Sequence, residues 1–272
     1  LVGSEMCIRD SNKYPYFLDW MPGIDEVVIF KTDTEGRARR AIAEADMIFC
    51  LDFNAVSRLE ILSDTIAANT TARRVLIDHH LSPDEGFDLM FSHPDSSSTC
   101  FLVYSIVEAM CGAGAITRRM AESLYVGMMT DTGNFAFSFL TPELFRAVAV
   151  LVEKGISIPD IHNSVYNAYT EGRARLFGYA INRKMEVIQD GTVAYMSLLE
   201  NEMRRFQFQQ GDSEGFVNYA LTIKKVKMSA MFLAHRKFIR VSLRSRGDVD
   251  VNLFARKYFS GGGHKNLSLI HI

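Results

Sequence analysis

Cysteine is scarce in this sequence, and the few cysteines present form no pattern. Only four occur among 272 residues: Cys7, Cys50, Cys100 and Cys111. They are scattered through apolar or helical stretches, and no two have the short spacing of a metal-binding pair. The pattern therefore argues against a disulfide framework and a cysteine-type zinc site, and it predicts buried, reduced thiols in a cytoplasmic protein.

Long uninterrupted hydrophobic runs are also missing. Charged residues break every extended apolar stretch before it reaches the length of a transmembrane helix. Residues 1–30 lack the basic-then-apolar order of a secretory signal. We therefore expect a cytoplasmic protein with no membrane partner. The chain is 48% hydrophobic, and its length is sufficient for two domains with sizeable cores.

Positive charge is deficient in the first part of the chain and in excess in the last. Residues 1–155 contain 13 Lys and Arg against 22 Asp and Glu, whereas residues 190–272 contain 13 against 7. An acidic region suits cations and a basic region suits a polyanion. Charge varies along any chain, so the asymmetry favours a two-domain division more strongly than it favours a phosphate-rich substrate.

Strand and helix signals alternate through residues 12–155, the first predicted domain. The predicted strands are residues 27–30, 47–52 and 74–78, and the predicted helices are residues 34–45, 57–68, 100–110, 117–130 and 142–155. Such alternation is typical of an α/β domain with a doubly wound, mostly parallel sheet.

The pattern changes after residue 155. Residues 156–185 are predicted to form a helical linker, and residues 186–266 a smaller α/β domain that begins with a hairpin at Asp190-Gly191. Residues 1–11 and 267–272 match neither neighbouring pattern and resemble translated adaptor sequence. We therefore treat both ends as non-native and exclude them from the predicted fold.

Residues able to bind metal follow three apolar runs of the first domain. Asp52 ends one run, Asp78-His79-His80 ends the next, and Asp131 closes a third. In an open α/β sheet, ligands bind at the carboxyl ends of the strands. Each residue taken alone is more simply explained as part of a turn or polar loop. Their joint occurrence favours a metal site built across one edge of a sheet.

The ligand types indicate which metal and which reaction to expect. Carboxylates with one or two imidazoles suit Mn²⁺ or Mg²⁺ better than a thiolate-type zinc site. Two such ions, roughly 3.5–4 Å apart, would activate a water for phosphoryl displacement. Asp78 could fix the tautomer of His79 as an outer partner. His80 would face the opposite side of the strand and serve the substrate phosphate as donor or general acid.

A second constellation lies near the end of the chain. Gly261-Gly262-Gly263-His264 would expose backbone N–H groups that bind anions. Arg244, on the polar face of a predicted strand, could clamp a phosphate. A flexible turn and a solvated strand face remain open as simpler explanations. Residues 212–218 (Asp-Ser-Glu-Gly-Phe-Val-Asn) are distinctive in composition, but no chemistry follows from them.

Together these motifs resemble the DHH phosphoesterase superfamily with its DHH-associated C-terminal domain. The matching segments are Leu51-Asp52-Phe53-Asn54, Asp78-His79-His80, Thr130-Asp131-Thr132-Gly133 and Gly261-Gly262-Gly263-His264. The resemblance covers roughly residues 12–266. It is strongest to the bacterial group of bifunctional oligoribonucleases and phosphoadenosine-phosphate phosphatases.

The resemblance implies a two-Mn²⁺ enzyme, with Mg²⁺ as the alternative, that hydrolyses short oligoribonucleotides (nanoRNA) and 3′-phosphoadenosine 5′-phosphate. Short RNA or a nucleoside bisphosphate would be its partner, no stable protein partner is expected, and a homodimer is left open. By motif match, the metal ligands are Asp52, His79 and Asp131, the catalytic residues His80 and Asp78, and the substrate-binding residues Arg244, Gly262, Gly263 and His264.

The family's first motif, of the type His-x-x-Pro-Asp-x-Asp, is absent from the sequence. We therefore expect that this chain cannot assemble the full two-metal site, and that Asp52, His79 and Asp131 hold a single ion loosely. The alternatives are a catalytically incomplete nucleotide-binding module and other activities of the superfamily: cyclic-dinucleotide phosphodiesterase, exopolyphosphatase, pyrophosphatase or long-strand exonuclease.

Overall fold

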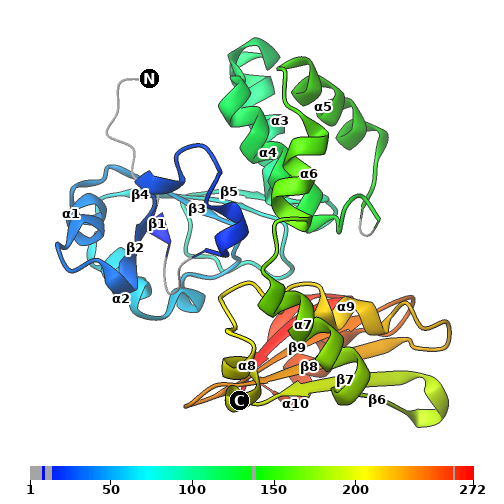
Figure 1. Cartoon of the computed structure of the whole chain (residues 1–272). Coiled ribbons are helices and arrows are strands. Elements are labelled where there is room, and N and C mark those ends of the chain that lie inside the picture. The colour runs from blue at the N-terminus through cyan, green and yellow to red at the C-terminus, as the bar shows by residue number, and fades with distance from the viewer. Residues whose placement is uncertain (1–7, 10–13, 137–138, 260) are drawn as a thin grey trace. The chain divides into compact units, whose positions relative to one another are not determined.

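The computed structural model describes residues 8–9, 14–136, 139–259 and 261–272. It divides into two compact units. Among the described residues, 8–9 and Leu18–Asn167 form the first, and Tyr14–Phe17 with Ala168–Ile272 form the second. Both units combine helices with strands, which confirms the α/β prediction (Figure 1).

The first unit contains a parallel sheet of order β3-β4-β5. Its strands are β3 (Met47–Leu51), β4 (Arg73–Asp78) and β5 (Leu89–Ser92). The four residues of β4 from Val75 onward are all buried, as expected of a strand covered on both faces. A separate parallel pair joins β1 (Ile8–Arg9) to β2 (Val28–Ile29).

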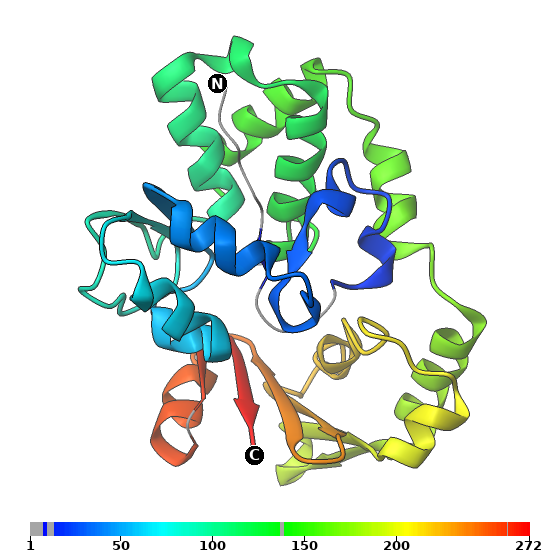
Figure 2. The same ribbon diagram turned by 90° about the vertical axis from the view of Figure 1, so that its left-hand side faces the viewer.

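Two helices provide the core beside these strands. They are α1 (Arg37–Glu44) and α2 (Glu60–Ala68), the latter preceded by a 3₁₀ turn at Val56–Leu59. The two helices pack together (Figure 2), and their apolar residues form one cluster with β2. The members of that cluster are Val28, Phe30, Ala38, Ile42, Leu62 and Ile66.

Four further helices complete the first unit: α3 (Thr99–Cys111), α4 (Arg118–Asp131), α5 (Pro142–Glu153) and α6 (Ile158–Tyr166). Each begins after a residue whose hydroxyl accepts a hydrogen bond from a backbone N–H of the first turn. These capping residues are Ser98, Thr117, Thr141 and Ser157. These four hydroxyl side chains therefore mark where the helices start.

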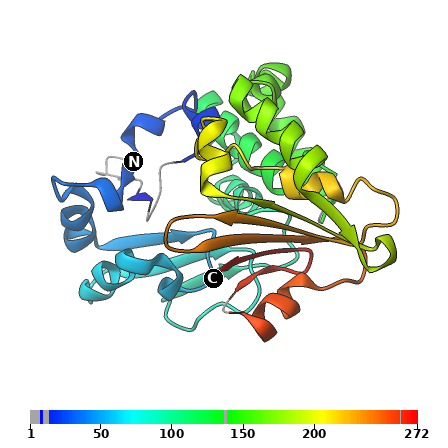
Figure 3. The ribbon, with the colours of Figure 1, turned by 60° about the horizontal axis from the view of Figure 1, so that its bottom comes forward.

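The second unit is a six-stranded sheet of order β10-β11-β9-β8-β7-β6 (Figure 3). Its strands are β6 (Met185–Ile188), β7 (Val193–Leu198), β8 (Met228–Ala234), β9 (Ile239–Ser245), β10 (Gly262–His264) and β11 (Leu267–His271). Among these described strands, β7 and β8 pair in parallel, and the other neighbouring pairs are antiparallel.

Helices cover both faces of this sheet. On one face lie α7 (Glu171–Tyr179), continued by a π-helical turn at Ala180–Lys184, with α8 (Glu200–Arg205) and α9 (Phe216–Ala220). On the other lies α10 (Val251–Tyr258). In β9, Val241 and Leu243 are buried in the α10 core, so Arg240 and Arg244 lie on the opposite face, as the alternation predicted.

Two stretches of the chain differ from the expectation. Residues 267–272, set aside as non-native, supply β11, which pairs with β9 from Arg240 to Arg244. Its alternate residues Ser268 and Ile270 are buried, and Ile270 joins the α10 core. Residues 156–185, expected to form a linker, divide instead: α6 belongs to the first unit and α7 to the second.

Across the described parts of the chain, no helix combines the length and apolar character that a bilayer crossing requires.

Candidate metal centre

Asp52 follows β3 in a left-handed backbone conformation, with φ of 65°. This conformation is uncommon outside glycine, although Asp and Asn adopt it more readily than most residues. The backbone N–H of Asp52 donates to the carbonyl of Ile77 on β4 at 3.2 Å. The chain therefore turns sharply where β3 ends, and the carboxylate is placed beside the end of β4.

His79 comes directly after β4 and is buried. Its Nδ1 lies 3.1 Å from the carbonyl oxygen of Ser96, which can only accept, so Nδ1 carries a proton. Its Nε2 lies 3.1 Å from Oδ2 of Asp131 and 3.6 Å from Oδ1 of Asp52. The imidazole is thus held from behind, and Nε2 points at two carboxylates.

Asp78 holds His80, which corrects the expectation that it would orient His79. Asp78 is fully buried, and its Oδ1 lies 2.6 Å from Nδ1 of His80, while its Oδ2 accepts from the His80 backbone N–H at 3.1 Å. Burial alone would raise the pKa of Asp78, but hydrogen bonds from His80 and the positive charge of its ring lower it. Asp78 therefore stays ionised and keeps the Nδ1 proton on His80.

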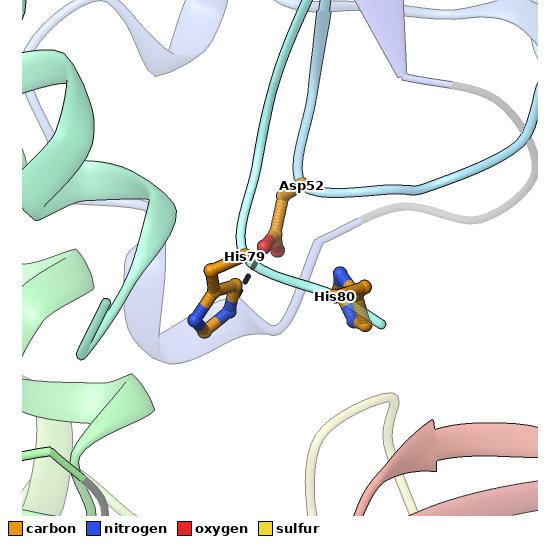
Figure 4. A group of neighbouring side chains, drawn as sticks. All are labelled: Asp52, His79 and His80. Carbon is orange, nitrogen blue, oxygen red and sulfur yellow. Dashed lines mark ion pairs between the residues drawn. The ribbon is translucent and has the colours of Figure 1, made fainter. Parts of the chain in front are cut away.

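His80 also lies closer to His79 than the strand alternation predicted. The two rings are 5.3 Å apart at an angle of 74°. One ligand atom each from Asp52, His79 and His80 lie within 4.8 Å of one another (Figure 4). The reason is that β4 ends at Asp78, so the strict alternation of a strand no longer applies to the two residues that follow.

Asp131 lies at the end of a helix, as the helix predicted over residues 117–130 implies, whereas Asp52 and His79 follow strands. It is the last residue of α4. The C-terminal end of a helix carries partial negative charge and disfavours a carboxylate. A carboxylate placed there, facing Asp52 across His79, needs a positive charge nearby.

The pKa shifts of the site show that its carboxylates need a positive charge between them. Burial, followed by the negative charge of Asp131, raises the pKa of Asp52. For His79, burial works against the charged form, but the hydrogen bond to Asp131 and the charges of Asp131 and Asp52 raise its pKa to about 9. The imidazole proton thus supplies the positive charge between the carboxylates. A divalent cation can replace that proton, so the donor set fits a metal ion.

Two supporting residues were not identified from the sequence. The hydroxyl of Thr99, the first residue of α3, donates to Oδ1 of Asp52 at 2.9 Å, and the Ser96 carbonyl orients His79. Both residues belong to the run Ser96-Ser97-Ser98-Thr99, in which Ser98 caps α3. The sequence did contain a clue to their role: four consecutive hydroxyl residues are more than a single helix cap requires.

Close packing of two helices places Asp131. A Cβ added to Gly127 of α4 would lie 2.1 Å from Sγ of Cys100 on α3. Glycine therefore lets α4 approach the start of α3, where Thr99 contacts Asp52. Burial, then the charges of Asp52 and Asp131, raise the pKa of Cys100 to about 12, so it remains a packed thiol.

The second unit places the predicted substrate residues on β9 and β10, the two strands that flank β11. Through Leu267 of β11, the register places His264 of β10 in the same row as Arg244 of β9; the side chain of His264 lies outside the described residues. Burial lowers the pKa of Arg244 to about 10, partly offset by the charge of Glu214. Arg244 is therefore still a cation at neutral pH.

The glycines form a strand and not the free loop that the sequence suggested. Gly262 and Gly263 pair with Leu269 and Ser268 of β11. A Cβ on Gly263, which has φ of 151°, would lie 2.2 Å from the carbonyl oxygen of Leu267, so this position requires glycine. A Cβ on Gly262 would meet nothing within 4 Å, so the space on that side of the strand is open.

Comparison with known proteins identifies the class. Residues 5–128 match the family described as DHH family, N-terminal domain, and residues 190–271 match the DHHA1 domain. The solved structure of an exopolyphosphatase-related protein from Bacteroides fragilis superposes with a TM-score of 0.90 at 40% identity, covering 98% of this chain and 77% of that chain. The chain therefore belongs to the DHH family, with a DHHA1 domain as its second part.

Two curated relatives are bifunctional oligoribonuclease and PAP phosphatase NrnA proteins. The one from Bacillus subtilis is 26% identical over 194 residues, which cover 71% of this chain and 60% of the relative. The one from Thermus thermophilus is 26% identical over 191 residues, covering 69% and 55%. The chain thus spans little more than half the length of these relatives.

Proposed function

We propose that this chain is the core of a metal-dependent phosphoesterase that hydrolyses short oligoribonucleotides and 3′-phosphoadenosine 5′-phosphate. The observation that carries the proposal is the convergence of Asp52, His79 and Asp131 on one point, with Nε2 of His79 within 3.6 Å of both carboxylates. The names of the two NrnA relatives indicate the substrates.

In this proposal Asp52, His79 and Asp131 hold Mn²⁺, or Mg²⁺ in its place. When bound, the metal supplies a water of lowered pKa and polarises the phosphoryl oxygen. Ser96 keeps the proton on Nδ1 of His79 and so leaves Nε2 as the ligand atom. Thr99 fixes the orientation of the Asp52 carboxylate.

His80 is the residue best prepared to act on the substrate. Asp78 holds its Nδ1, and we propose that its Nε2 donates to a phosphate oxygen or hands a proton to the leaving group. Asp78 acts through His80 as a positioning residue. In the second unit, Arg244 and the backbone at Gly262 are proposed to bind the anionic part of the nucleotide.

The test is to assay the 272-residue chain, and any longer product of its gene, with Mn²⁺ against a 5′-phosphorylated dinucleotide and 3′-phosphoadenosine 5′-phosphate. Mononucleotide release that His79→Ala abolishes would support the proposal. If every product binds Mn²⁺ at this site and none hydrolyses either compound, the proposal is wrong. For this chain alone we expect one weakly bound ion and little turnover.

A second candidate is hydrolysis of inorganic polyphosphate, because the solved structure at 40% identity is described as exopolyphosphatase-related. The same assay with a short polyphosphate chain separates the two. Release of orthophosphate from polyphosphate at a higher kcat/KM than from the nucleotides would favour this candidate.

A further inference from the structure

The segment with no chemistry assigned from the sequence, residues 212–218, lies against the arginine face of β9. The carboxylate of Glu214 is 3.5 Å from Nη2 of Arg240. The charge of Glu214 also favours the protonated form of Arg244, whereas Arg240 disfavours it. Glu214 therefore interacts with both arginines of this strand face.

The backbone of Glu214 is held firmly from α7. Nη2 of Arg173 donates to the Glu214 carbonyl oxygen at 2.8 Å. The guanidinium carbon of Arg173 lies 3.3 Å from the centroid of the Tyr169 ring, a stacking contact that restrains the side chain. Asp212, two residues earlier, is fully buried and accepts from the backbone N–H of Gln209 at 2.7 Å. The position of Glu214 is therefore set independently of Arg240 and Arg244.

Arg240 has capacity for a further anionic partner. Within the described residues its Nε is buried and lacks a hydrogen-bond partner. A guanidinium presents five N–H donors, and one carboxylate at 3.5 Å does not satisfy them. The Arg240–Glu214 pair also stabilises the fold little, because the two side chains are 26% and 46% exposed.

Arg240 and Arg244 stand on one face of β9, about 13 Å apart along the strand at about 3.3 Å per residue. Both side chains are long enough to reach toward the same ligand from two ends. Two cations at the ends of one strand face suit a ligand with two separated anionic groups better than a ligand with one.

We propose that Arg240 is a second anion-binding residue beside Arg244, and that Glu214 is a positioning residue that aims it. The ligand class is a ribonucleotide with two phosphate groups, such as a nucleoside bisphosphate. This inference rests on the proposed function, since it concerns how the same substrate is held in the second unit.

The test measures binding without hydrolysis. The 272-residue chain is titrated calorimetrically in EDTA with 3′-phosphoadenosine 5′-phosphate and, separately, with adenosine 5′-monophosphate. Arg240→Gln is expected to weaken bisphosphate binding about tenfold and monophosphate binding less than threefold, because one charge-assisted contact is lost. Arg256→Gln removes the same charge from an exposed position on α10, across the sheet, and should change neither affinity by more than about twofold.

Glu214 is tested by a double-variant cycle. Glu214→Ala should weaken bisphosphate binding about fivefold alone and add little to Arg240→Gln, because both changes remove one interaction. Glu214→Gln keeps an acceptor oxygen and should restore most of the affinity. It also serves as the test variant if Glu214→Ala lowers the melting temperature.

The outcomes separate this inference from the proposed function. No metal and no turnover are involved, so failure of the phosphoesterase proposal would leave the binding results unchanged. If Arg240→Gln weakened both ligands equally, or if Glu214→Ala tightened binding, the inference would be overturned. Absence of any bisphosphate binding by the unmodified chain would also overturn it.

Discussion

The candidate site of the first unit and that of the second unit are opposite in charge and in construction. In the first, carboxylate oxygens of Asp52 and Asp131 lie within 3.6 Å of Nε2 of His79. In the second, Arg240 and Arg244 lie along a single strand. The first arrangement suits a small cation that needs several ligands at one point. The second suits an extended anion that needs charges spread along a surface.

Removing His79 should have the largest effect on binding of all the changes considered. It would disrupt the cation site and leave the anion site intact. His79→Ala is expected to lower Mn²⁺ affinity by about a hundredfold or more, because loss of an outer partner alone costs 10–100-fold and His79 is a direct ligand. Calorimetric titration of the 272-residue chain measures this. His93→Ala, an exposed histidine of the same unit, should bind as the unmodified chain does. Undiminished binding by His79→Ala would place the metal elsewhere.

Replacing Arg244 should break the anion site and leave the cation site intact. Arg244→Ala removes a half-buried guanidinium, and we expect affinity for 3′-phosphoadenosine 5′-phosphate to fall about tenfold or more through the loss of charge-assisted hydrogen bonds. Mn²⁺ affinity should not change. Equal nucleotide affinity in variant and unmodified chain would refute the assignment, and a matching loss of Mn²⁺ affinity would show that the two sites are not independent.

The contrast also explains what the sequence could predict. Asp52 and His79 were found because each follows an apolar run whose end is visible in the sequence. Asp131 was found by its motif, and the helix predicted before it over residues 117–130 is confirmed as α4, whose last residue is Asp131. The relation of His80 to Asp78 depends on β4 ending one residue before His79, and element ends are the least certain part of such predictions.

Residues that support the sites through tertiary contacts were harder to predict from the sequence. The Thr99 hydroxyl and the Ser96 carbonyl support the site only because α3 starts beside β3 and β4. Arg240 and Glu214 are far apart in sequence, and only the packing of the segment before α9 against β9 brings them together. Local patterns cannot reveal such pairs. The strand β11 was missed because the end of the chain was set aside on its composition.

The pH dependence of metal binding tests whether His79 is a ligand of the cation site. His79 must be neutral to bind metal, and its pKa is raised to about 9 without metal. Mn²⁺ affinity should therefore rise about tenfold per pH unit up to about pH 9 and then level off. Calorimetric titrations between pH 6.5 and 8 would check this slope, and His79→Gln, which lacks the titrating group, should abolish it.

The metal-free chain should respond to pH in the opposite direction. A raised pKa means that the folded state binds the proton more tightly than the unfolded chain does. The stability contributed by His79 is thus fully present below its ordinary pKa of 6.5 and is lost as the pH rises through about 9. Melting temperatures in EDTA should fall across that window by more in the unmodified chain than in His79→Gln.

The smallest effect on binding, a few-fold change, is expected from Gly127, which sets the distance between the helices that frame the cation site. In Gly127→Ala, the new Cβ would lie 2.1 Å from Sγ of Cys100, so α4 must shift and carry Asp131 away from His79. Overpacking of this kind costs about 1–3 kcal/mol in stability, and Mn²⁺ affinity should fall few-fold while nucleotide affinity stays unchanged. The control is Gly178→Ala, in α7 with nothing within 4 Å of the added Cβ. It should instead be neutral or stabilising by up to about 1 kcal/mol. If Gly127→Ala melted at the same temperature as Gly178→Ala and bound Mn²⁺ equally well, close approach of α3 and α4 would not be what positions Asp131.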